Sequence, residues 1–384
     1  MYRFVLTPRV ESDLARIDAL HKQLDARGVL PRRWAGRLRR DLEAESVAAS
    51  TSMEGVPVTV EEVRRILVGD RPGGVSEEDA ALVSGYRDAM SFVLRRTDDP
   101  DFTWEPELIR SIHDRVLAGS FSRGAGRYRE GIVQITAGDR LVYTPPDTDL
   151  VAGLVVALAQ WLTGSTKMAA PVVAALAHVQ LAGIHPFADG NGRTARILAS
   201  LVMFRRGFTL PEFTSLEEWW GSHRDEYYAA FGCLGERWDS STDVSPFVEA
   251  HVGAQRAQVE TLALKQGTER VIWTVLEDAM VEDMNGYPRM TDALFDAFFG
   301  RDVTNRYYRG LADVSSVTAS HDLSKMVASG LLKAEGAGRS TTYRGTARLA
   351  ATVGSAMRME IDETVPLEDI RPALVAKIAE KLRG

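Results

Sequence analysis

Apolar residues recur every three to four positions through most of the first hundred residues, a spacing that predicts amphipathic helices. The first apolar stripe consists of Leu14, Ile17, Leu20 and Leu24. Pro31 interrupts the pattern, which then continues to about Met53 and ends at 55–57, where Gly and Pro occur. Thr59 and Glu62 have the spacing of a capping box, so a further short helix is expected to begin there.

Beyond residue 75 the pattern predicts helices first and then a hairpin. Ser76 and Asp79 predict the start of a longer helix, and Pro106 stands where Pro is common, in a first helical turn. Over 124–146, Gly and β-branched residues become frequent, and two short apolar runs flank the turn residues 137–139. This change of pattern predicts a β-hairpin.

The middle of the chain is again predicted to be helical. Residues 169–184 are apolar on almost every side, which indicates a central, buried helix. A Gly-rich turn over 185–192 follows, and Gly207 is expected to end the next helix. Ser215 and Glu218 form a second capping-box pattern before an aromatic-rich segment. The helices expected here cover 169–184, 194–206, 215–231 and 244–264.

A domain junction is predicted at 265–267, and a different order of elements follows it. We expect three helices, over 271–280, 304–311 and 318–329, and two strands, over 330–334 and 340–344. Three helices and a two-stranded wing are the element order of a winged helix-turn-helix. The fold class is therefore mainly α, in three regions: N-terminal helices at 1–100, a helical core with the hairpin at 101–265, and a winged helix with a helical tail at 266–384.

Composition narrows the class of protein. The 384 residues are 45% hydrophobic and 26% charged, as in a soluble globular protein of more than one domain. A single cysteine, Cys233, excludes an intramolecular disulfide and a thiolate zinc site. The net charge of −7 argues against a general polyanion binder. The chain opens without a signal-peptide pattern, and its most apolar runs are too short to span a bilayer, so we expect a cytoplasmic protein without a membrane partner.

The residues best suited to chemistry gather at 184–196, in the run Ile-His-Pro-Phe-Ala-Asp-Gly-Asn-Gly-Arg-Thr-Ala-Arg. Pro186 disfavours helical backbone at the preceding residue and turns the chain out of the helix. The N–H groups of 190–192, at the start of the next helix, can bind an anion. Arg193 and Arg196 lie three positions apart on that helix, and two guanidinium groups beside such N–H groups suit a polyphosphate.

Two further residues of this run complete the chemistry. Asp189 would repel a phosphate unless it binds Mg²⁺, the usual companion of nucleotide phosphates. His185 can remove a proton from an attacking hydroxyl group. The residues alone thus indicate a nucleotide site with a base beside it.

This run resembles the Fic family signature, His-Pro-Phe-x-(Asp/Glu)-Gly-Asn-Gly-Arg-x-x-Arg, at every defined position. The resemblance implies a Fic-type helical core that transfers AMP from ATP to a hydroxyl of a protein, with His185 as the catalytic base and Asp189 as the Mg²⁺ ligand. Gly at the middle of the loop favours AMP transfer, because family members that transfer phosphate have a Lys and an Ala there. The phosphate-binding residues implied are Gly190, Asn191, Gly192, Arg193 and Arg196.

A second segment resembles the inhibitory motif of the same family, (Ser/Thr)-x-x-x-Glu-(Gly/Asn). It runs from Ser50 through Glu54, at the end of a helix expected over about 34–54. A Glu54 carboxylate paired with Arg196 would occupy the guanidinium group that is implied to hold the γ-phosphate. ATP could then bind only with its α-phosphate misaligned for attack.

The hairpin over 124–146 resembles the family's flap, which aligns a target segment by strand addition. The resemblance places Tyr228 near the adenine. It also places four flap residues beside the nucleotide and the incoming hydroxyl, namely Ile132, Val133, Gln134 and Ile135.

Several candidate residues also have an ordinary structural interpretation. His185 could be a structural histidine, and the two arginines could be solvated helix charges. His178, seven residues earlier, is interpreted as a core histidine because no third ligand has metal-site spacing. His113 is interpreted as a packing residue that forms hydrogen bonds near the flap, and Cys233 as an inert apolar residue.

The winged-helix region differs in charge from the rest of the chain. Over 301–348, eight Lys and Arg stand against four Asp and Glu, an excess of four positive charges. Such a region can contact DNA phosphates, or it can instead pack on the core, form a dimer or present protein targets. The candidate DNA contacts are Ser315, Ser316, Thr318, Ser320, Lys325, Arg339 and Arg344.

Three functional hypotheses follow. The first is a self-inhibited, Mg²⁺-dependent adenylyltransferase that modifies a Ser, Thr or Tyr of a protein partner, the chain itself included. The second is a DNA-binding regulator with a nucleotide-sensing Fic core. The third is an enzyme that removes AMP from a modified protein, with Glu54 positioning the water. Related chains suggest a homodimer.

Overall fold

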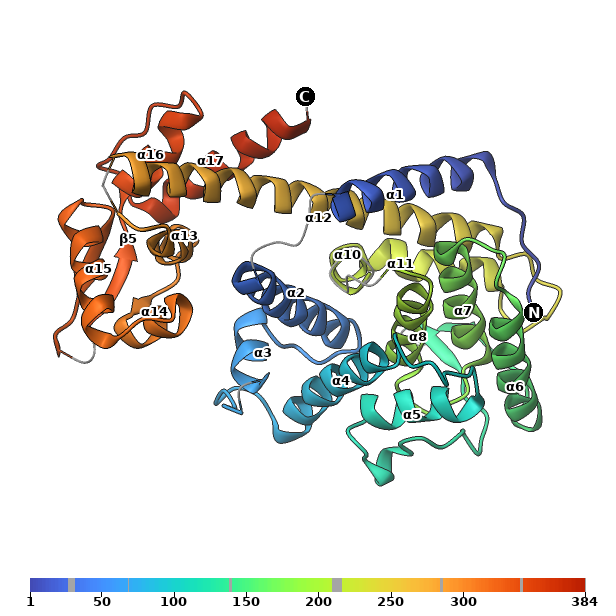
Figure 1. The fold of residues 1–384 in the computed structure, drawn as a ribbon. Helices are drawn as coiled ribbons and strands as arrows, with labels where there is room; N and C mark the ends of the chain where they lie inside the picture. Colours follow the sequence, from blue (N-terminus) through green and yellow to red (C-terminus); the bar gives the residue numbers. More distant parts are fainter. Residues whose placement is uncertain are drawn as a thin grey trace. The chain divides into compact units, whose positions relative to one another are not determined.

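The computed structural model describes residues 1–26, 32–67, 69–137, 140–208, 216–283, 286–338 and 341–383. The chain divides into two compact units, 1–260 and 261–384 (Figure 1). Both are mainly helical, as the sequence predicts. Within the described ranges, no helix is both long enough and apolar enough to cross a membrane. The expectations for Pro31, the hairpin tip, Ser215 and Arg339 fall outside those ranges.

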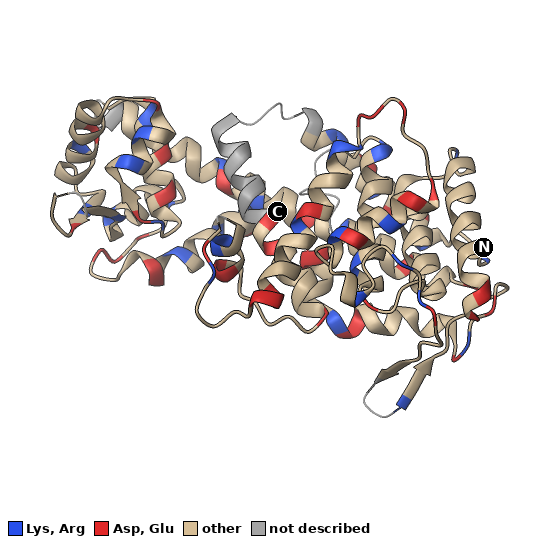
Figure 2. Ribbon diagram, turned by 90° about the horizontal axis from the view of Figure 1, so that it is seen from below, with Lys and Arg blue, Asp and Glu red and all other residues tan. Residues whose placement is uncertain are grey.

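The first unit consists of helices and one β-hairpin. Its first helices are α1 (Pro8–Ala26), α2 (Arg32–Met53), α3 (Val60–Leu67) and α4 (Glu77–Arg95). Then come α5 (Pro106–Val116), α6 (Thr148–Gly164), α7 (Ala170–Ile184) and α8 (Asn191–Arg205). The last are α10 (Glu217–Ser222), α11 (Arg224–Ala230) and α12 (Ser245–Asp278), with 3₁₀ turns at Phe121–Arg123 and Phe231–Leu234. Strands β1 (Ile135–Ala137) and β2 (Arg140–Tyr143) form a hairpin that projects from the helices (Figure 2).

The core of this unit is centred on α7 and α8. Almost every residue of α7 is buried, as its apolar sequence predicts. Leu181 and Ile184 of α7 pack with Ala195 and Leu198 of α8 in one apolar cluster. A second cluster joins the other side of α8 to helices α2 to α5. The loop 185–190 therefore connects two buried helices, which hold it at both ends.

The helix start signals of the N-terminal region are confirmed. The backbone N–H of Thr59 donates to Glu62 Oε2 at 2.8 Å, and the backbone N–H of Glu62 donates to Thr59 Oγ1 at 3.2 Å. At the start of α4, Ser76 Oγ accepts from the backbone N–H of Asp79 at 3.0 Å. Gly55, with a φ of +86°, separates α2 from α3.

Two helix boundaries differ from the expectation. Helix α8 begins at Asn191, before the expected residue 194, because Gly190 adopts a left-handed φ of +75° and the helix starts directly after it. The aromatic-rich helix expected over 215–231 is divided into α10 and α11. His223, with φ −127° and ψ +48°, leaves the helical region, and its Nδ1 lies 2.9 Å from the carbonyl oxygen of Trp219.

The hairpin is shorter than expected. Strand β1 begins at Ile135 and not at residue 132, and its pairing with β2 is irregular between Ile135 and Thr136. Just before this segment, the carbonyl oxygen of Gly131 accepts from Arg129 Nη1 at 3.0 Å. This backbone group is therefore engaged by a side chain and not by a partner strand.

The helix end expected near residue 264 is wrong, because α12 runs through 265–267 without interruption. A glycine inside a helix costs only about 1 kcal/mol relative to Ala, which tertiary packing can offset. The boundary between the two compact units nevertheless falls nearby, between residues 260 and 261.

The second unit contains helices around a small sheet. After a π-helical turn at Ala279–Asp283 and a 3₁₀ turn at Pro288–Met290, its elements are α13 (Thr291–Phe298), β3 (Val303–Thr304), α14 (Asn305–Ala312), α15 (Ser316–Ala328), β4 (Leu332–Glu335), β5 (Thr342–Gly345), α16 (Ala347–Ala356) and α17 (Leu367–Arg383). The strand order is β3-β5-β4, all antiparallel. The sequence did not predict α13 or β3. Assignment of this unit as a winged helix stays a prediction.

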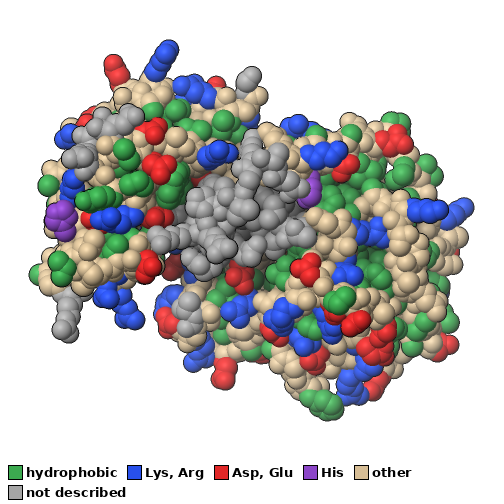
Figure 3. All heavy atoms as spheres, viewed as in Figure 1, with side chains coloured by type: hydrophobic (Ala, Val, Ile, Leu, Met, Phe, Trp, Pro, Cys, Tyr) green, Lys and Arg blue, Asp and Glu red, His purple; other side chains and the backbone are tan. Residues whose placement is uncertain are grey.

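Charged side chains near the predicted wing are largely neutralised by their neighbours. Arg344 Nε lies 2.6 Å from Asp302 Oδ1, and Arg344 Nη1 lies 3.3 Å from Glu335 Oε2. Lys333 pairs with Glu335 at 2.9 Å. Figure 3 shows acidic and basic side chains interspersed on the visible face of each unit. The local positive excess in the sequence is thus not gathered at Arg344.

Candidate functional site

The candidate site is the loop between α7 and α8, whose backbone is shaped by two left-handed residues. His185 has a φ of +50° and ends α7, with its backbone N–H donating to the carbonyl of Leu181 at 3.0 Å. Pro186 follows, so the chain leaves the helix where the sequence predicts. Gly190 has a φ of +75° and starts α8. The loop therefore places the His185 side chain and the N-terminus of α8 on the same short segment.

His113 of α5 packs against the loop and forms a hydrogen bond with it. Its ring stacks on Phe187 with centroids 3.6 Å apart and an angle of 3° between the planes. His113 Nδ1 accepts from the backbone N–H of Gly126 at 3.1 Å, so Nε2 carries the proton and donates to the carbonyl of Asp189 at 2.9 Å. Burial lowers the pKa of His113 to about 4 and keeps the ring neutral. The interpretation of His113 as a packing residue is confirmed.

Asn191 stabilises the loop from within. Its Oδ1 accepts from the backbone N–H of Phe187 at 3.0 Å, and its Nδ2 donates to the carbonyl of Phe187 at 2.9 Å. The side chain is buried, so any contact of Asn191 with a ligand would come from its backbone N–H.

Arg129, in the segment 124–146 that resembles the family's flap, ties this flap to the loop. Arg129 Nε donates to the carbonyl of His185 at 2.9 Å, and its backbone N–H donates to the carbonyl of Pro186 at 2.9 Å. Its Nη1 donates to Thr148 Oγ1 at 3.0 Å, and its Nη2 donates to the carbonyl of Pro146. One buried guanidinium group thus fixes the base of the hairpin relative to His185.

His185 has the protonation state that a base requires. Its Nδ1 lies 3.3 Å from the carbonyl oxygen of Ala182, which can only accept, so Nδ1 carries the proton. Nε2 then presents a lone pair. Burial lowers the pKa of His185 to about 4, so the ring is neutral at physiological pH.

Arg193 leaves two buried donors without acceptors. Its side chain is only 3% exposed, and its Nη2 lies 3.3 Å from Asp189 Oδ1. Its Nε and Nη1 are buried and have no hydrogen-bond partner. Arg193 is in the first turn of α8, whose first N–H groups have no acceptor within the helix. Unpaired donors of this kind point to an anionic ligand.

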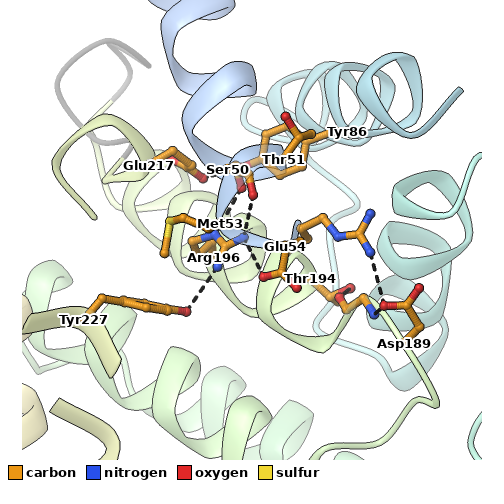
Figure 4. Close-up of polar contacts among 12 residues, drawn as sticks. Ser50, Thr51, Met53, Glu54, Tyr86, Asp189, Thr194, Arg196, Glu217 and Tyr227 are labelled. Carbon is orange, nitrogen blue, oxygen red and sulfur yellow. Dashed lines mark hydrogen bonds and ion pairs between the residues drawn. The ribbon is translucent and has the colours of Figure 1, made fainter. Parts of the chain in front are cut away.

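Arg196 is occupied by the segment from Ser50 to Glu54 (Figure 4). Arg196 Nη2 lies 3.0 Å from Glu54 Oε1, and Arg196 Nε donates to Ser50 Oγ at 3.1 Å. Its Nη1 donates to Tyr227 Oη at 3.2 Å. Burial alone would lower the pKa of Arg196, but Tyr227, Glu54 and other acidic neighbours raise it. The guanidinium group is therefore charged and fully engaged.

Glu54 also covers the N-terminus of α8. A Cβ atom added to Gly192 would stand 2.5 Å from Glu54 Oε1, so the carboxylate lies directly on the glycine backbone. The structure thus brings Glu54, Gly192 and Arg196 together, and a carboxylate occupies part of the space that a bound phosphate would need.

Tyr86 and Glu217, which no sequence pattern marks as functional, form a hydrogen-bonded pair near Arg196. Tyr86 Oη donates to Glu217 Oε1 at 2.5 Å, and both side chains are buried. Figure 4 shows the pair beside Ser50. Both groups act electrostatically on Arg196, and no local pattern marks them because Tyr86 lies far from Arg196 and Glu217 in the sequence.

Tyr228 and the four predicted flap residues differ in their surroundings. Tyr228 Oη donates to the carbonyl of Met53 at 3.0 Å, whereas its neighbour Tyr227 reaches Arg196. Ile132 is 79% exposed, Gln134 is exposed and Val133 half-buried, and Ile135 packs at the edge of an apolar cluster. The nucleotide contacts expected of these residues stay predictions.

Asp189 could hold a metal ion only together with the phosphate groups of a bound molecule and water. Its side chain is 46% exposed, and Oδ1 accepts from the backbone N–H of Gly190 at 2.6 Å. The described ranges contain no group of three His, Cys, Asp or Glu side chains that could hold a metal ion. Mg²⁺ at nucleotide sites takes one or two carboxylates and completes its shell with phosphates and water, so this donor set fits.

Three buried histidines predict acid lability of the fold. Burial lowers the pKa of His113 to about 4 and of His251 to about 3, and it lowers the pKa of His178 well below its usual value. In the unfolded chain these groups protonate near pH 6.5, so below that pH the unfolded state binds more protons. The free energy of unfolding should therefore fall as the pH drops from 6.5 to 4. The expected slope is about 1.4 kcal/mol per pH unit for each histidine.

Urea unfolding at pH 7 and at pH 5 measures this effect. His251→Leu removes one titrating group and should make the dependence shallower, whereas His321→Gln, at a side chain that is 73% exposed, should leave it unchanged. Equal stability of the wild type at both pH values would contradict the prediction.

The fold and the site together define a helical domain with a loop that carries a neutral histidine and, in Arg193, buried donors without partners. Residues 103–203 match the profile of the Fic/DOC family. These residues therefore form a Fic domain, as the signature in the loop predicts.

Curated relatives support this assignment over part of their length. Protein adenylyltransferase fic-1 of Caenorhabditis briggsae is 33% identical over 168 residues, which are 43% of this chain and 30% of the relative. Protein adenylyltransferase Fic of Culex quinquefasciatus is 28% identical over 242 residues, which are 62% of this chain and 45% of the relative. This chain thus spans less than half the length of these relatives.

Solved structures share the fold. A Fic family protein from Desulfovibrio desulfuricans G20 aligns with a TM-score of 0.60 at 24% identity, over 90% of this chain and 98% of that chain. Fic-1 from C. elegans aligns with a TM-score of 0.54 at 26% identity, over 67% of this chain and 73% of that chain. The expected Fic-type helical core is confirmed.

Proposed function

We propose that this chain is a self-inhibited protein adenylyltransferase, which transfers AMP from ATP to a hydroxyl group of a protein. The names of the curated relatives support the reaction class. The observation that carries the proposal is the pair of buried, unpartnered donors on Arg193 beside the N-terminus of α8. Such a site is electrostatically incomplete without an anion, and a nucleotide phosphate supplies one.

The transfer follows from the placement of His185. The hydroxyl oxygen of the target attacks the α-phosphorus of ATP, its proton passes to His185 Nε2, and the bond to the bridging oxygen breaks to release pyrophosphate. The N–H groups at the start of α8 and the guanidinium of Arg193 stabilise the charge that develops on the phosphate oxygens. Asp189 would hold Mg²⁺ together with the phosphates, and the ion would neutralise part of their charge.

Glu54 accounts for the inhibition in this proposal. Its carboxylate takes one side of the Arg196 guanidinium group and lies on the Gly192 backbone. A bound triphosphate would need both the Arg196 guanidinium group and the space over the Gly192 backbone. Activation therefore requires Glu54 to leave, and with it the end of α2.

Other functions stay open to the same experiments. Removal of AMP from a protein would use Glu54 to position water, and it predicts activity that Glu54→Gly destroys. We do not propose DNA binding by the second unit, because Arg344, one of its candidate DNA contacts, is paired with Asp302. The target protein, modification of the chain by itself and the homodimer stay predictions.

Intact-mass measurement of the Glu54→Gly protein after incubation with ATP and Mg²⁺ tests the proposal. We expect a gain of one AMP residue per modified hydroxyl, on the chain or on an added protein substrate. A gain of one phosphate would indicate phosphate transfer instead. No gain, together with no ATP binding by calorimetry, would overturn the proposal.

A further inference from the structure

Helix α2, which ends just before Glu54, makes an unusually close contact with α10. A Cβ atom added to Gly221 of α10 would stand 2.7 Å from the Cβ and 3.2 Å from the Cα of Ala49 in α2. Carbon atoms in good contact are about 3.5–4.0 Å apart, so only glycine fits at this position. The Gly221 backbone of α10 thus lies directly against the Ala49 methyl group of α2. Larger side chains would hold the two helices farther apart.

The same face of α2 makes two more contacts one turn later. Met53 is buried in an apolar cluster with Leu216 and Trp220, at the start and within α10. The carbonyl of Met53 accepts from Tyr228 Oη at 3.0 Å. Ala49 and Met53 are four residues apart and therefore lie on one side of the helix. We call this contact, formed by Ala49 and Met53 against α10 and α11, the α2 seam.

We propose that the α2 seam sets the depth at which Glu54 enters the active site, so that Gly221 is a positioning residue for inhibition. This inference rests on the proposed function. Glu54 directly follows Met53, so any displacement of α2 at the seam is passed to the carboxylate. The Arg196 Nη2 to Glu54 Oε1 distance is 3.0 Å, and an increase of about 1 Å would take it beyond hydrogen-bond range. A natural activator would act by opening this seam.

A methyl group added at Gly221 tests the inference. Relief of the 2.7 Å contact requires α2 and α10 to separate by about 1 Å, because the nearest atoms include backbone that cannot rotate away. We expect Gly221→Ala to raise AMP transfer about tenfold, and Ala49→Val, which adds bulk from the other side, to do the same. In the Glu54→Gly background, Gly221→Ala should have no further effect.

Two matched variants separate this mechanism from general damage. The double variant Gly221→Ala with Ala49→Gly moves the methyl group from one helix to the other, so it should restore inhibition. Gly232→Ala adds a methyl group where nothing lies within 4 Å and should behave as wild type. Hydrogen exchange of the amides of 47–53 gives a readout besides activity, and we expect faster exchange in Gly221→Ala and recovery in the double variant.

The outcomes distinguish the seam from the reaction. If Glu54→Gly is active but Gly221→Ala is not, the seam is overturned and the proposed function stands. If the double variant remains as active as Gly221→Ala, the activation has another cause and the seam is also overturned. If Glu54→Gly is inactive, the proposed function fails, and hydrogen exchange alone decides whether the seam positions α2.

Discussion

His185→Ala, made in the Glu54→Gly protein, is expected to lower AMP transfer by about 10²- to 10⁴-fold, the range that general bases contribute. The physical reason is the position and protonation of the ring. Its Nδ1 lies 3.3 Å from the carbonyl oxygen of Ala182, and burial lowers its pKa to about 4, so Nε2 is free to accept a proton. Incorporation of α-³²P-AMP over time measures the loss.

The binding of nucleotide should survive this change, because the donors that face the phosphates come from α8 and not from His185. Calorimetry with ATP and Mg²⁺ is therefore expected to show similar affinity in both proteins. His321→Ala, at an exposed position of the second unit, serves as the matched control and should transfer AMP normally. Undiminished transfer by the His185→Ala protein would exclude the histidine as the base.

Glu54→Gly alone is expected to raise AMP transfer by about 10- to 100-fold over the wild type. A hydrogen bond between charged groups contributes about 1.5–3 kcal/mol, which corresponds to this range of rates if inhibition depends on the Arg196 pair. The change also clears the backbone of Gly192, which the carboxylate covers. The same labelling assay, at equal protein concentration, measures the gain.

Glu54→Gln and Glu61→Ala are informative companions. The glutamine keeps the shape and one acceptor but loses the charge, so we expect partial activation. Glu61 lies on the surface of α3, where it pairs with Arg64 at 3.2 Å, and its removal should have no effect. Loss of activity in Glu54→Gly would instead support a role for Glu54 in AMP removal.

Local sequence was sufficient for the features that depend on short-range physics. The starts of α3 and α4 were predicted because their caps lie within four residues of each other in the chain. The loop 185–196 was recognised because its residues are contiguous, and the burial of α7 follows from its apolar composition. The pairing of Glu54 with Arg196 was anticipated only through resemblance to a family.

Other features had no local signal. The break at His223 and the uninterrupted α12 depend on packing, which outweighs the small preferences of single residues. Glu217 looks like an ordinary charged residue in the sequence, yet it is buried and bonded to Tyr86, a residue distant in the chain. The contact of Tyr227 with Arg196, and that of Tyr228 with the Met53 carbonyl, depend on which side of α11 faces the core.

The sequence by itself determined the helical character of this protein, the Gly-rich loop after α7 and the residues that can carry its chemistry, because each is encoded within a few neighbouring positions. The tertiary structure alone decided that Arg193 has unpaired donors, that Glu54 lies on Gly192, and that Gly221 meets Ala49. These are contacts between segments separated by up to about 170 residues, and only the packed core brings them within a few ångströms.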